Sequence, residues 1–255
     1  MLAFDQLRDP ASINIAKMGQ TMMLDKGLGL NAVDDLIATA GAYISFAKFG
    51  WGTAATMSQA LIQEKTARYR AANITPYPGG TLLEVALRQG KLNEFLTEAK
   101  ALGFTGIEVS DGSTTVDVHT RAETIKAARE AGFFVLSEVG KKDPTLDHEL
   151  TVEQRIAAIN ADLRNGAHYV ILEAREAGKN IGIYDQNGQI VQSELDALAA
   201  NGISQVIFEA PLKPQQVALI LQLGSQVNLG NIAHDEVTAL ETLRRGLRGD
   251  TVGRV

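Results

Sequence analysis

The sequence predicts a single (β/α)8 barrel over residues 1–255, and three observations support this fold class. Eight short apolar runs rich in Val, Ile, Phe and Tyr recur along the 255 residues, as expected for strands that are buried on both faces. Helix-like patterns lie between these runs, which indicates right-handed βαβ units and a parallel sheet. Repeats of roughly 30 residues each fill a chain of the size typical of such barrels.

The alternative fold is a doubly wound open sheet. It is less favoured because no G-x-G-x-x-G motif follows the first predicted strand. No linker, low-complexity tract or shift in composition divides the chain, so we expect one domain. The predicted strands are residues 21–24, 43–49, 73–77, 106–110, 133–139, 168–174, 205–210 and 226–230.

Capping residues indicate where the predicted helices begin and end. One helix is expected to open at an Asn31 cap, and another at Thr120, with Glu123 completing a capping box. A third has Pro214 in its first turn, where the missing N–H costs nothing. Glycines follow several of these patterns, as is common at helix ends. The predicted helices include residues 31–41, 120–132, 151–166, 213–224 and about 235–247.

The composition excludes several classes of function. The net charge of -6 argues against nonspecific binding of nucleic acid, which needs a basic surface. The absence of cysteine excludes disulfides, thiolate zinc sites and a cysteine nucleophile. No apolar run approaches the roughly 18 residues that span a bilayer, and the amino terminus lacks the pattern of a signal peptide. We therefore expect a cytoplasmic protein without nucleic-acid or membrane partners.

Charged side chains stand where several predicted strands end, which in a barrel is the position of the chemistry. Carboxylates of this kind suit a hard cation such as Mg²⁺, and the cations suit an anionic, phosphorylated substrate. A structural ion pair is an equally good interpretation of any one of these residues, but the set favours a site. The carboxylates are Glu108, Glu138, Glu173 and Glu209, and the cations are Lys26, Lys48, Lys141 and Arg175.

Residues 229–236, "LGNIAHDE", predict a phosphate site, because Gly230 permits close backbone approach and a helix is expected to follow. The alternative is an ordinary turn with Asp235 as the helix cap. Other polar residues at strand ends are Tyr77, Asn228 and Asn231. Trp51 either lines the site or packs under a loop, and packing is the preferred interpretation.

The phrases at the strand ends, taken in order, resemble the phosphosulfolactate synthase family. The resemblance extends from about Asp25 to the carboxyl terminus. Any one phrase is weak, but the ordered set is specific. The phrases are "DKG", "KFGWGT", "YPGGTL", "EVSDGS", "VLSEVGKK", "EARE", "IFEAPLKPQQ", "VNLGNI" and "LETLRRGLRGDT".

The resemblance implies a Mg²⁺-dependent barrel that adds sulfite to phosphoenolpyruvate, giving (2R)-phospho-3-sulfolactate for coenzyme M or sulfolactate synthesis. It implies that Lys141 donates a proton to the substrate, with Lys142 as the other candidate. Anion-binding residues would be Lys26, Lys48 and Arg175. The metal ligands would come from Asp111, Glu138, Glu173 and Glu209, and Tyr77, Asn228, Gly230 and Asn231 would complete the substrate site.

Two departures from the family pattern concern the substrate. Ala177 replaces an expected serine, and Lys17 is the nearest replacement for an expected arginine before the first strand. The alternatives are a different nucleophile for a phosphoenolpyruvate-like substrate, or a non-catalytic, stress-related barrel. Barrels of this kind commonly associate, so we expect a homo-oligomer.

Overall fold

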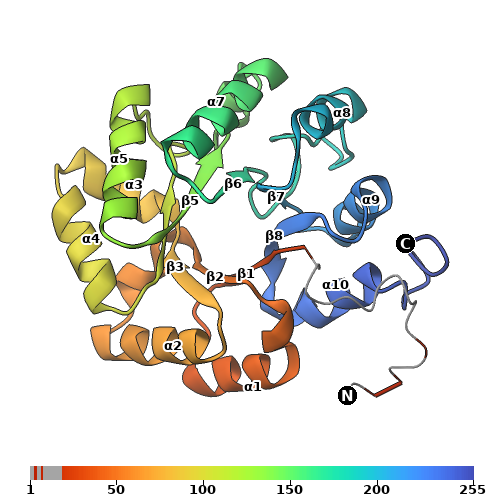
Figure 1. Cartoon of the computed structure of the whole chain (residues 1–255), viewed down its shortest axis with the longest axis horizontal. Helices are drawn as coiled ribbons and strands as arrows, with labels where there is room; N and C mark the ends of the chain where they lie inside the picture. Colours follow the sequence, from red (N-terminus) through yellow and green to blue (C-terminus); the bar gives the residue numbers. More distant parts are fainter. Residues whose placement is uncertain (1–2, 5–6, 8–18) are drawn as a thin grey trace.

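The chain folds into a nearly closed barrel of parallel strands surrounded by helices (Figure 1). This computed structural model describes residues 3–4, 7 and 19–255, so Lys17 lies outside the described residues. Every predicted strand is confirmed, with ends that differ by a few residues. The strands are β1 (Thr21–Asp25), β2 (Phe46–Phe49), β3 (Thr75–Pro78), β4 (Gly106–Val109), β5 (Phe134–Val139), β6 (Tyr169–Leu172), β7 (Val206–Glu209) and β8 (Asn228–Ala233).

The strand order is β3-β2-β1-β8-β7-β6-β5-β4, and each paired neighbour is parallel. The seam lies between β3 and β4, where the Thr105 N–H donates to the carbonyl of Pro76 at 3.2 Å. Pro76 and Pro78 have no N–H to offer a ladder, which accounts for the weak pairing there. Pairing of β1 with β8 closes the other side, so the barrel is confirmed over the open sheet.

Helices alternate with the strands and form the outer layer in Figure 1. Thr151 caps the helix predicted to begin there and forms a capping box with Gln154, and Pro214 lies in the first turn of another helix, as predicted. Within the described residues the helices are α1 (Leu30–Ala40), α2 (Gln59–Ala71), α3 (Gly80–Arg88), α4 (Leu92–Ala101), α5 (Val118–Glu130), α6 (Pro144–Asp147), α7 (Val152–Asn165), α8 (Gln192–Asn201), α9 (Lys213–Leu223) and α10 (Val237–Arg244).

Three predicted helix starts are wrong. Asn31 lies inside α1, whose N-cap is Gly29. Asp117 rather than Thr120 caps α5, because its carboxylate accepts the N–H groups of His119 and Thr120. At the end of the chain, a short 3₁₀ turn, η6 (His234–Glu236), precedes α10, and Asp235 makes no side-chain cap there.

An apolar layer fills the barrel interior below the charged mouth. It consists of one side chain from each of six strands: Met22, Phe46, Tyr77, Leu136, Ile171 and Ile207. Because side chains alternate along a strand, the residue two positions later points the same way. Phe46 is followed by Lys48, Leu136 by Glu138, Ile171 by Glu173 and Ile207 by Glu209. The strands thus deliver a ring of ionisable groups to the carboxyl end of the barrel.

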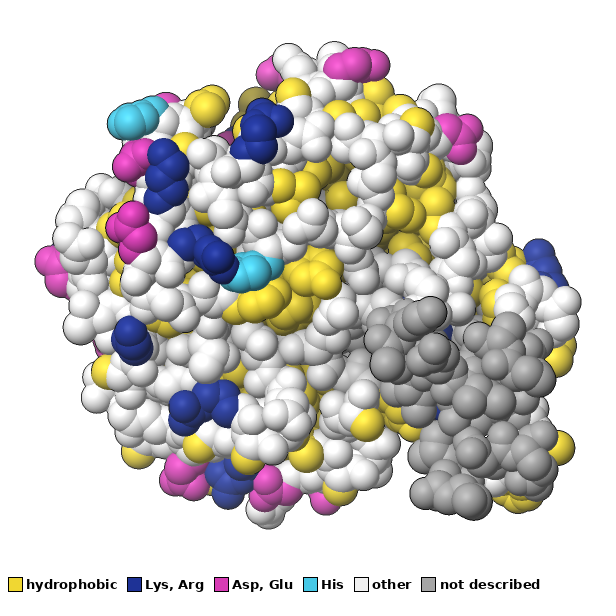
Figure 2. All heavy atoms as spheres, in the orientation of Figure 1, with side chains coloured by type: hydrophobic (Ala, Val, Ile, Leu, Met, Phe, Trp, Pro, Cys, Tyr) yellow, Lys and Arg dark blue, Asp and Glu magenta, His cyan; other side chains and the backbone are white. Residues whose placement is uncertain are grey.

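A larger apolar cluster between the strands and the helices forms the outer core. On the face shown in Figure 2, charged side chains lie mostly toward the periphery, with hydrophobic side chains nearer the centre. Among the described residues, no helix is both long and apolar enough to cross a membrane.

Candidate active site

Lys48, on β2, lies at the centre of the barrel mouth and is surrounded by carboxylates. Its Nζ is 2.9 Å from Glu108 Oε2, 3.0 Å from Glu138 Oε2 and 3.5 Å from Glu209 Oε1. These acids come from β4, β5 and β7, and all are buried. Burial alone would lower the pKa of Lys48, but the three carboxylates outweigh it and raise that pKa well above its usual value. Lys48 therefore stays charged.

A second charged group, Lys142, lies between Glu138 and Glu173. Its Nζ is 3.7 Å from Glu138 Oε1 and 4.0 Å from Glu173 Oε2, and it donates to Thr81 Oγ1 at 2.7 Å. Burial alone would lower the pKa of Lys142, but Glu138 and Glu173 raise it above its usual value. The mouth thus contains two lysines amid buried glutamates.

The carboxylates of the mouth do not titrate alike. Burial alone would raise the pKa of Glu138, but Lys48 and Lys142 lower it to about 2. Burial raises the pKa of Glu108 to about 7 despite Lys48. Burial, with the charges of Glu138 and Glu209, raises the pKa of Glu173 well above its usual value. The mouth therefore has more negative charge than its lysines balance, and it favours binding of a proton or another cation.

A cavity of about 380 Å³ opens above this cluster. Trp51 lines it and is 53% exposed, so the expectation that Trp51 packs under a loop is wrong. Trp51 has a left-handed backbone (φ 54°) in η5 (Gly50–Thr56), a conformation that is uncommon for a large residue. Of the predicted site residues, the cavity is lined by Lys48, Glu173, Arg175, Glu209 and Asn231; Glu108 and Lys142 line it too.

A bulge in β8 turns Asn231 toward the cavity. The pairing of β1 with β8 shifts register between Thr21 and Met23, and Asn231 there has φ 57°. Its Nδ2 donates to the backbone carbonyl of Arg175 at 3.0 Å, and Arg175 also has φ 57°. Two left-handed residues thus join the end of β8 to the loop after β6, at the edge of the cavity.

The amino end of α3 approaches the acids closely. The N–H of Gly80 donates to Glu108 Oε1 at 2.6 Å. A Cβ on Gly80 would lie 2.8 Å from that oxygen and would also overlap Ser110, so only glycine fits. Glu84, one turn further along α3, accepts from Ser110 Oγ at 2.6 Å. The "PGGT" turn and the loop after β4 are therefore fixed to one another.

Two carboxylate oxygens at the mouth are suitable for a divalent cation. Glu138 Oε1 and Glu173 Oε2 are buried and have no hydrogen-bond partner among the described residues. Mg²⁺ commonly takes one or two protein carboxylates and completes its shell with substrate oxygens and water. Within the described part of the chain, no three acidic or histidine side chains form a ready-made metal group. Glu209 is less available, because it accepts from the Ala174 N–H and lies near Lys48.

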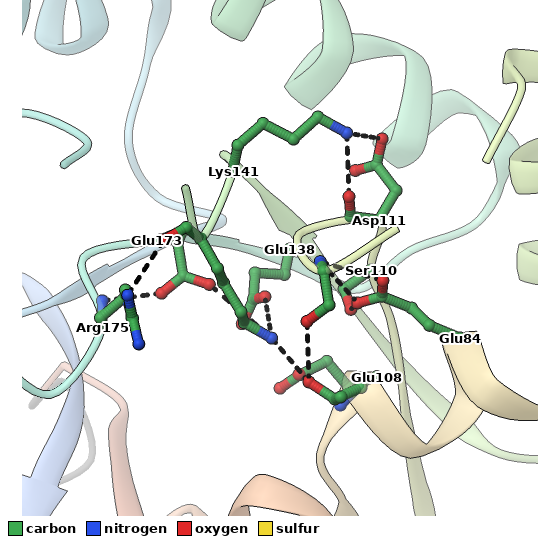
Figure 3. A network of polar contacts seen from close by, with 12 residues as sticks. Glu84, Glu108, Ser110, Asp111, Glu138, Lys141, Glu173 and Arg175 are labelled. Carbon is green, nitrogen blue, oxygen red and sulfur yellow. Dashed lines mark hydrogen bonds and ion pairs between the residues drawn. The ribbon is translucent and has the colours of Figure 1, made fainter. Parts of the chain in front are cut away.

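Asp111 and Lys141 lie to one side of the mouth and bind each other. Lys141 Nζ is 2.5 Å from Asp111 Oδ2 and also donates to the Asp111 carbonyl at 2.8 Å. Arg121 holds the other oxygen of Asp111 at 3.1 Å. Figure 3 shows Lys141 extending away from Glu108 and Glu138 toward Asp111. Neither Lys141 nor Asp111 lines the cavity above Lys48, because Gly140, at φ 132°, redirects the chain after β5. Lys141 lines an adjoining hollow instead.

Three further predicted residues do not line the cavity. Tyr77 is fully buried in the apolar layer beneath the mouth, where its hydroxyl accepts or donates no hydrogen bond among the described residues and interacts electrostatically with Glu108 and Lys48. Asn228 begins β8 at the opposite end of the barrel, where its amide binds the Gln20 N–H and the carbonyls of Ser204 and Val206. Gly230 lies within β8, where a Cβ would be 2.6 Å from Met22 Cε, so the glycine makes room for core packing.

Lys26 lies at the rim of the mouth. Its Nζ is 4.6 Å from the centre of the Trp51 ring, within the range of a cation–π interaction. Trp51 in turn lines the cavity. Lys26 therefore stands beside the entrance and not among the buried acids.

Some residues of helices and loops hold the site in place, and strand-end positions in the sequence do not identify them. Arg121, on α5, binds Asp162 and the carbonyl of Glu138, which fixes the end of β5. The buried carboxylate of Asp147 binds Arg155 at 2.8 Å and also accepts the N–H groups of Lys141 and Gly182. Arg121 and Arg155 lie in predicted helices, but their partners are set by tertiary packing, which the sequence pattern does not reveal.

The fold and the site define an enzyme-type (β/α)8 barrel, with buried acids and lysines at the carboxyl ends of the strands. The (2R)-phospho-3-sulfolactate synthase (ComA) family model matches residues 15–250. The chain is 54% identical to the phosphosulfolactate synthase of Methanocaldococcus jannaschii over 238 residues, 93% of this chain and 95% of that protein. It is 47% identical over 256 residues to that of Methanothermobacter thermautotrophicus, covering 100% and 99%. The chain therefore belongs to the phosphosulfolactate synthase family.

Comparison with solved structures supports the fold alone. A phosphonopyruvate hydrolase complexed with oxalate and Mg²⁺ superposes with a TM-score of 0.55 at 14% identity, covering 90% of this chain and 80% of that one. A 3-hexulose-6-phosphate synthase superposes with a TM-score of 0.53 at 17% identity, covering 89% and 98%. Both likenesses agree with the barrel that the strand order defines.

The raised pKa values predict how the stability of metal-free protein depends on pH. Glu108 binds its proton more tightly in the folded state, so its contribution is present below its ordinary pKa of 4.5 and is lost as pH rises through about 7. The pKa values of Glu173 and Glu209 are also raised, so their contributions have the same pH dependence. The contribution of Glu138 is instead present above 4.5 and is lost only as pH falls toward 2. Between pH 5 and 8, the carboxylates with raised pKa values therefore determine whether the free energy of unfolding rises or falls with pH.

We expect the free energy of unfolding in EDTA to fall from pH 5 to pH 8, on the order of 3 kcal/mol for Glu108 alone. Any divalent cation that binds these carboxylates should raise the melting temperature more at pH 8 than at pH 6, because at the lower pH it competes with a proton. Urea titrations at several pH values measure the first effect, and Glu108→Gln should flatten it. A stability that rises steadily over this range in EDTA would contradict the assigned charges.

Proposed function

We propose that this protein adds sulfite to phosphoenolpyruvate in a Mg²⁺-dependent reaction that gives (2R)-phospho-3-sulfolactate, for coenzyme M or sulfolactate synthesis. Membership of the family supports the product. The observation that most directly supports the chemistry is that Lys142, which lines the cavity, lies 3.7 and 4.0 Å from two buried carboxylate oxygens that accept no hydrogen bond among the described residues. The carboxylates proposed to bind the metal and the lysine proposed to donate the proton thus lie next to one another.

Glu138 and Glu173 are the residues that would hold Mg²⁺. When bound, the ion would supply positive charge that stabilises the negative charge building on the substrate carboxylate. Glu138 is suited to this role because Lys48 and Lys142 lower its pKa and keep it ionised. Glu173 would give up its proton as the cation binds.

The reaction forms one bond to sulfur and one to hydrogen. The sulfur lone pair of sulfite attacks the methylene carbon of phosphoenolpyruvate, and the electron pair of the carbon–carbon double bond moves toward the neighbouring carbon and its carboxylate. That neighbouring carbon then takes a proton. No bond to phosphate breaks, and nothing is oxidised or reduced, so a single proton donor completes the addition.

Lys142 is the proton donor in this proposal, in place of Lys141. Its ammonium lines the cavity, whereas that of Lys141 is bound to Asp111. Glu138 and Glu173 keep Lys142 protonated before metal binds. Mg²⁺ on those two carboxylates would remove part of their pull on the proton, which would bring the lysine closer to the pKa of an effective acid. The neutral amine is then reprotonated from solvent.

The remaining groups suit the anionic parts of the substrate. Asn231 lines the cavity, and so do residues 79–81, at the amino end of α3. Helix amino ends favour oxyanions. Lys48 provides a fixed positive charge at the floor, held by three acids.

Consumption of phosphoenolpyruvate by purified protein tests this function. With Mg²⁺ and sulfite present, we expect phosphosulfolactate to be detected by mass spectrometry, and no product when either is omitted or EDTA is added. Product formed with another nucleophile, but not with sulfite, would replace the proposal with a related addition. No consumption by folded, metal-loaded protein with any nucleophile would indicate a non-catalytic barrel.

A further inference from the structure

A second hollow adjoins the main cavity at the barrel mouth. It has a volume of about 650 Å³ and lies between residues 112–115, after β4, and residues 141–144, after β5, with Leu146 and Arg175 completing its wall. We call it the side pocket. Lys142 and Arg175 line both the side pocket and the main cavity, so the two spaces meet at these side chains.

The two spaces differ in charge. The ionisable groups that line the main cavity are four carboxylates and three cations. The side pocket is lined by three cations, Lys141, Lys142 and Arg175, and by one carboxylate, Asp143. Asp143 is occupied as the cap of α6, where it accepts the Thr145 N–H at 2.8 Å. The main cavity therefore suits a cation with its ligands, and the side pocket suits a small anion.

Arg175 is the cation at this junction that is most available to a ligand. Its guanidinium donates to the carbonyl of Lys142 at 3.1 Å, and it forms no ion pair among the described residues. By contrast, Lys142 lies between two glutamates, and Lys141 is bound to Asp111. A guanidinium has five N–H donors in a planar fork that matches an oxyanion, so most of its donors remain for a ligand.

The position of Arg175 is set by the backbone and not by chance packing of a long side chain. Its left-handed conformation (φ 57°) is held by its own N–H, which donates to Glu173 Oε1 at 2.7 Å, and by Asn231, which binds its carbonyl. Figure 3 shows Arg175 beside Glu173, at the edge of the acidic cluster. The guanidinium is thereby directed to the boundary between the two spaces.

We propose that the side pocket is the binding site of the nucleophilic anion, sulfite, separate from the main cavity that takes the phosphorylated substrate. This inference rests on the proposed function. Sulfite would lie against Arg175 and the hydroxyl-bearing residues Ser113 and Thr115, and would reach the methylene carbon past Lys142. A second space lets two anions bind together, with Arg175 facing sulfite and Lys48 facing the phosphorylated substrate, and it places the second anion away from most of the carboxylates that repel it.

Steady-state kinetics with both substrates varied tests the assignment. Arg175→Gln should raise the KM for sulfite at least 10-fold and leave the KM for phosphoenolpyruvate within about twofold. Thr115→Tyr, which fills the side pocket without removing a charge, should act in the same direction. Lys179→Gln is the matched control, because Lys179 is an exposed cation on the same loop outside both linings. Inorganic sulfate should compete with sulfite and not with phosphoenolpyruvate.

Equal increases in both KM values, or sulfate that competes with phosphoenolpyruvate, would overturn the separate site. If the wild-type protein forms no product, the proposed function fails first, and calorimetry then tests the pocket by itself. Sulfate binding to the wild type that is lost in Arg175→Gln and kept in Lys179→Gln would retain an anion site. Equal binding by all three proteins would remove it.

Discussion

Replacing Lys142 with alanine is expected to lower kcat by roughly 10²- to 10⁴-fold, the range attributed to a positioned general acid. The variant removes the ammonium that lies between Glu138 and Glu173 and lines the cavity. Lys141→Ala is the matched comparison, because that lysine is its chain neighbour but is bound to Asp111 and lines only the side pocket. We expect Lys141→Ala, at saturating sulfite, to keep kcat within about 10-fold of the wild type.

Turnover assays with both variants, with circular dichroism to verify folding, measure this difference. Small primary amines added to Lys142→Ala should restore part of the rate if the missing group is a proton donor, whereas a purely structural defect would not respond. A wild-type kcat in Lys142→Ala together with a large loss in Lys141→Ala would reverse the assignment and return the role to Lys141.

Replacing Lys48 with methionine is expected to destabilise metal-free protein by about 3–5 kcal/mol at pH 8, because it leaves buried carboxylates without their central cation. Glu108, Glu138 and Glu209 all lie within 3.5 Å of its Nζ. At pH 5 the loss should be smaller, since the raised pKa of Glu108 lets that acid take up a proton. The two pH values thus separate a charge effect from a packing effect.

Chemical denaturation of the wild type and Lys48→Met at both pH values gives the two differences. Lys126→Met is a suitable control, because Lys126 forms an exposed pair with Glu123 and exposed pairs contribute little. A loss of stability in Lys48→Met that is the same at pH 5 and pH 8 would indicate that the lysine matters through its packing and not through its charge.

Much of the barrel could be predicted from the sequence, because buried parallel strands appear as apolar runs. The ring of ionisable side chains that points into the barrel mouth could also be predicted. Alternation from Phe46 leads to Lys48, and from Leu136 to Glu138, without knowledge of any contact. Alternation therefore identifies which side chains of β2 and β5 point into the barrel mouth.

Side-chain positions were hardest to predict where the chain leaves the regular strand. After Gly140, at φ 132°, Lys142 lines the cavity and Lys141 binds Asp111, and alternation does not apply beyond that glycine. Strand β8 runs past its predicted end and contains a bulge, which places Asn231 at the cavity and leaves Asn228 at the far end. Asp111 lies to one side of the mouth, where it binds Arg121. Arg121 is a helix residue, and its contact is set by tertiary packing.

The most direct test of the account is a ¹³C NMR experiment in D₂O with phosphoenolpyruvate labelled at its methylene carbon, together with Mg²⁺, sulfite and the protein. The account predicts that the label moves from the vinyl position to a methylene carbon bonded to sulfur, with one deuterium on the adjacent carbon. Label recovered in the methyl group of pyruvate, or left in unreacted phosphoenolpyruvate by folded protein, would contradict it.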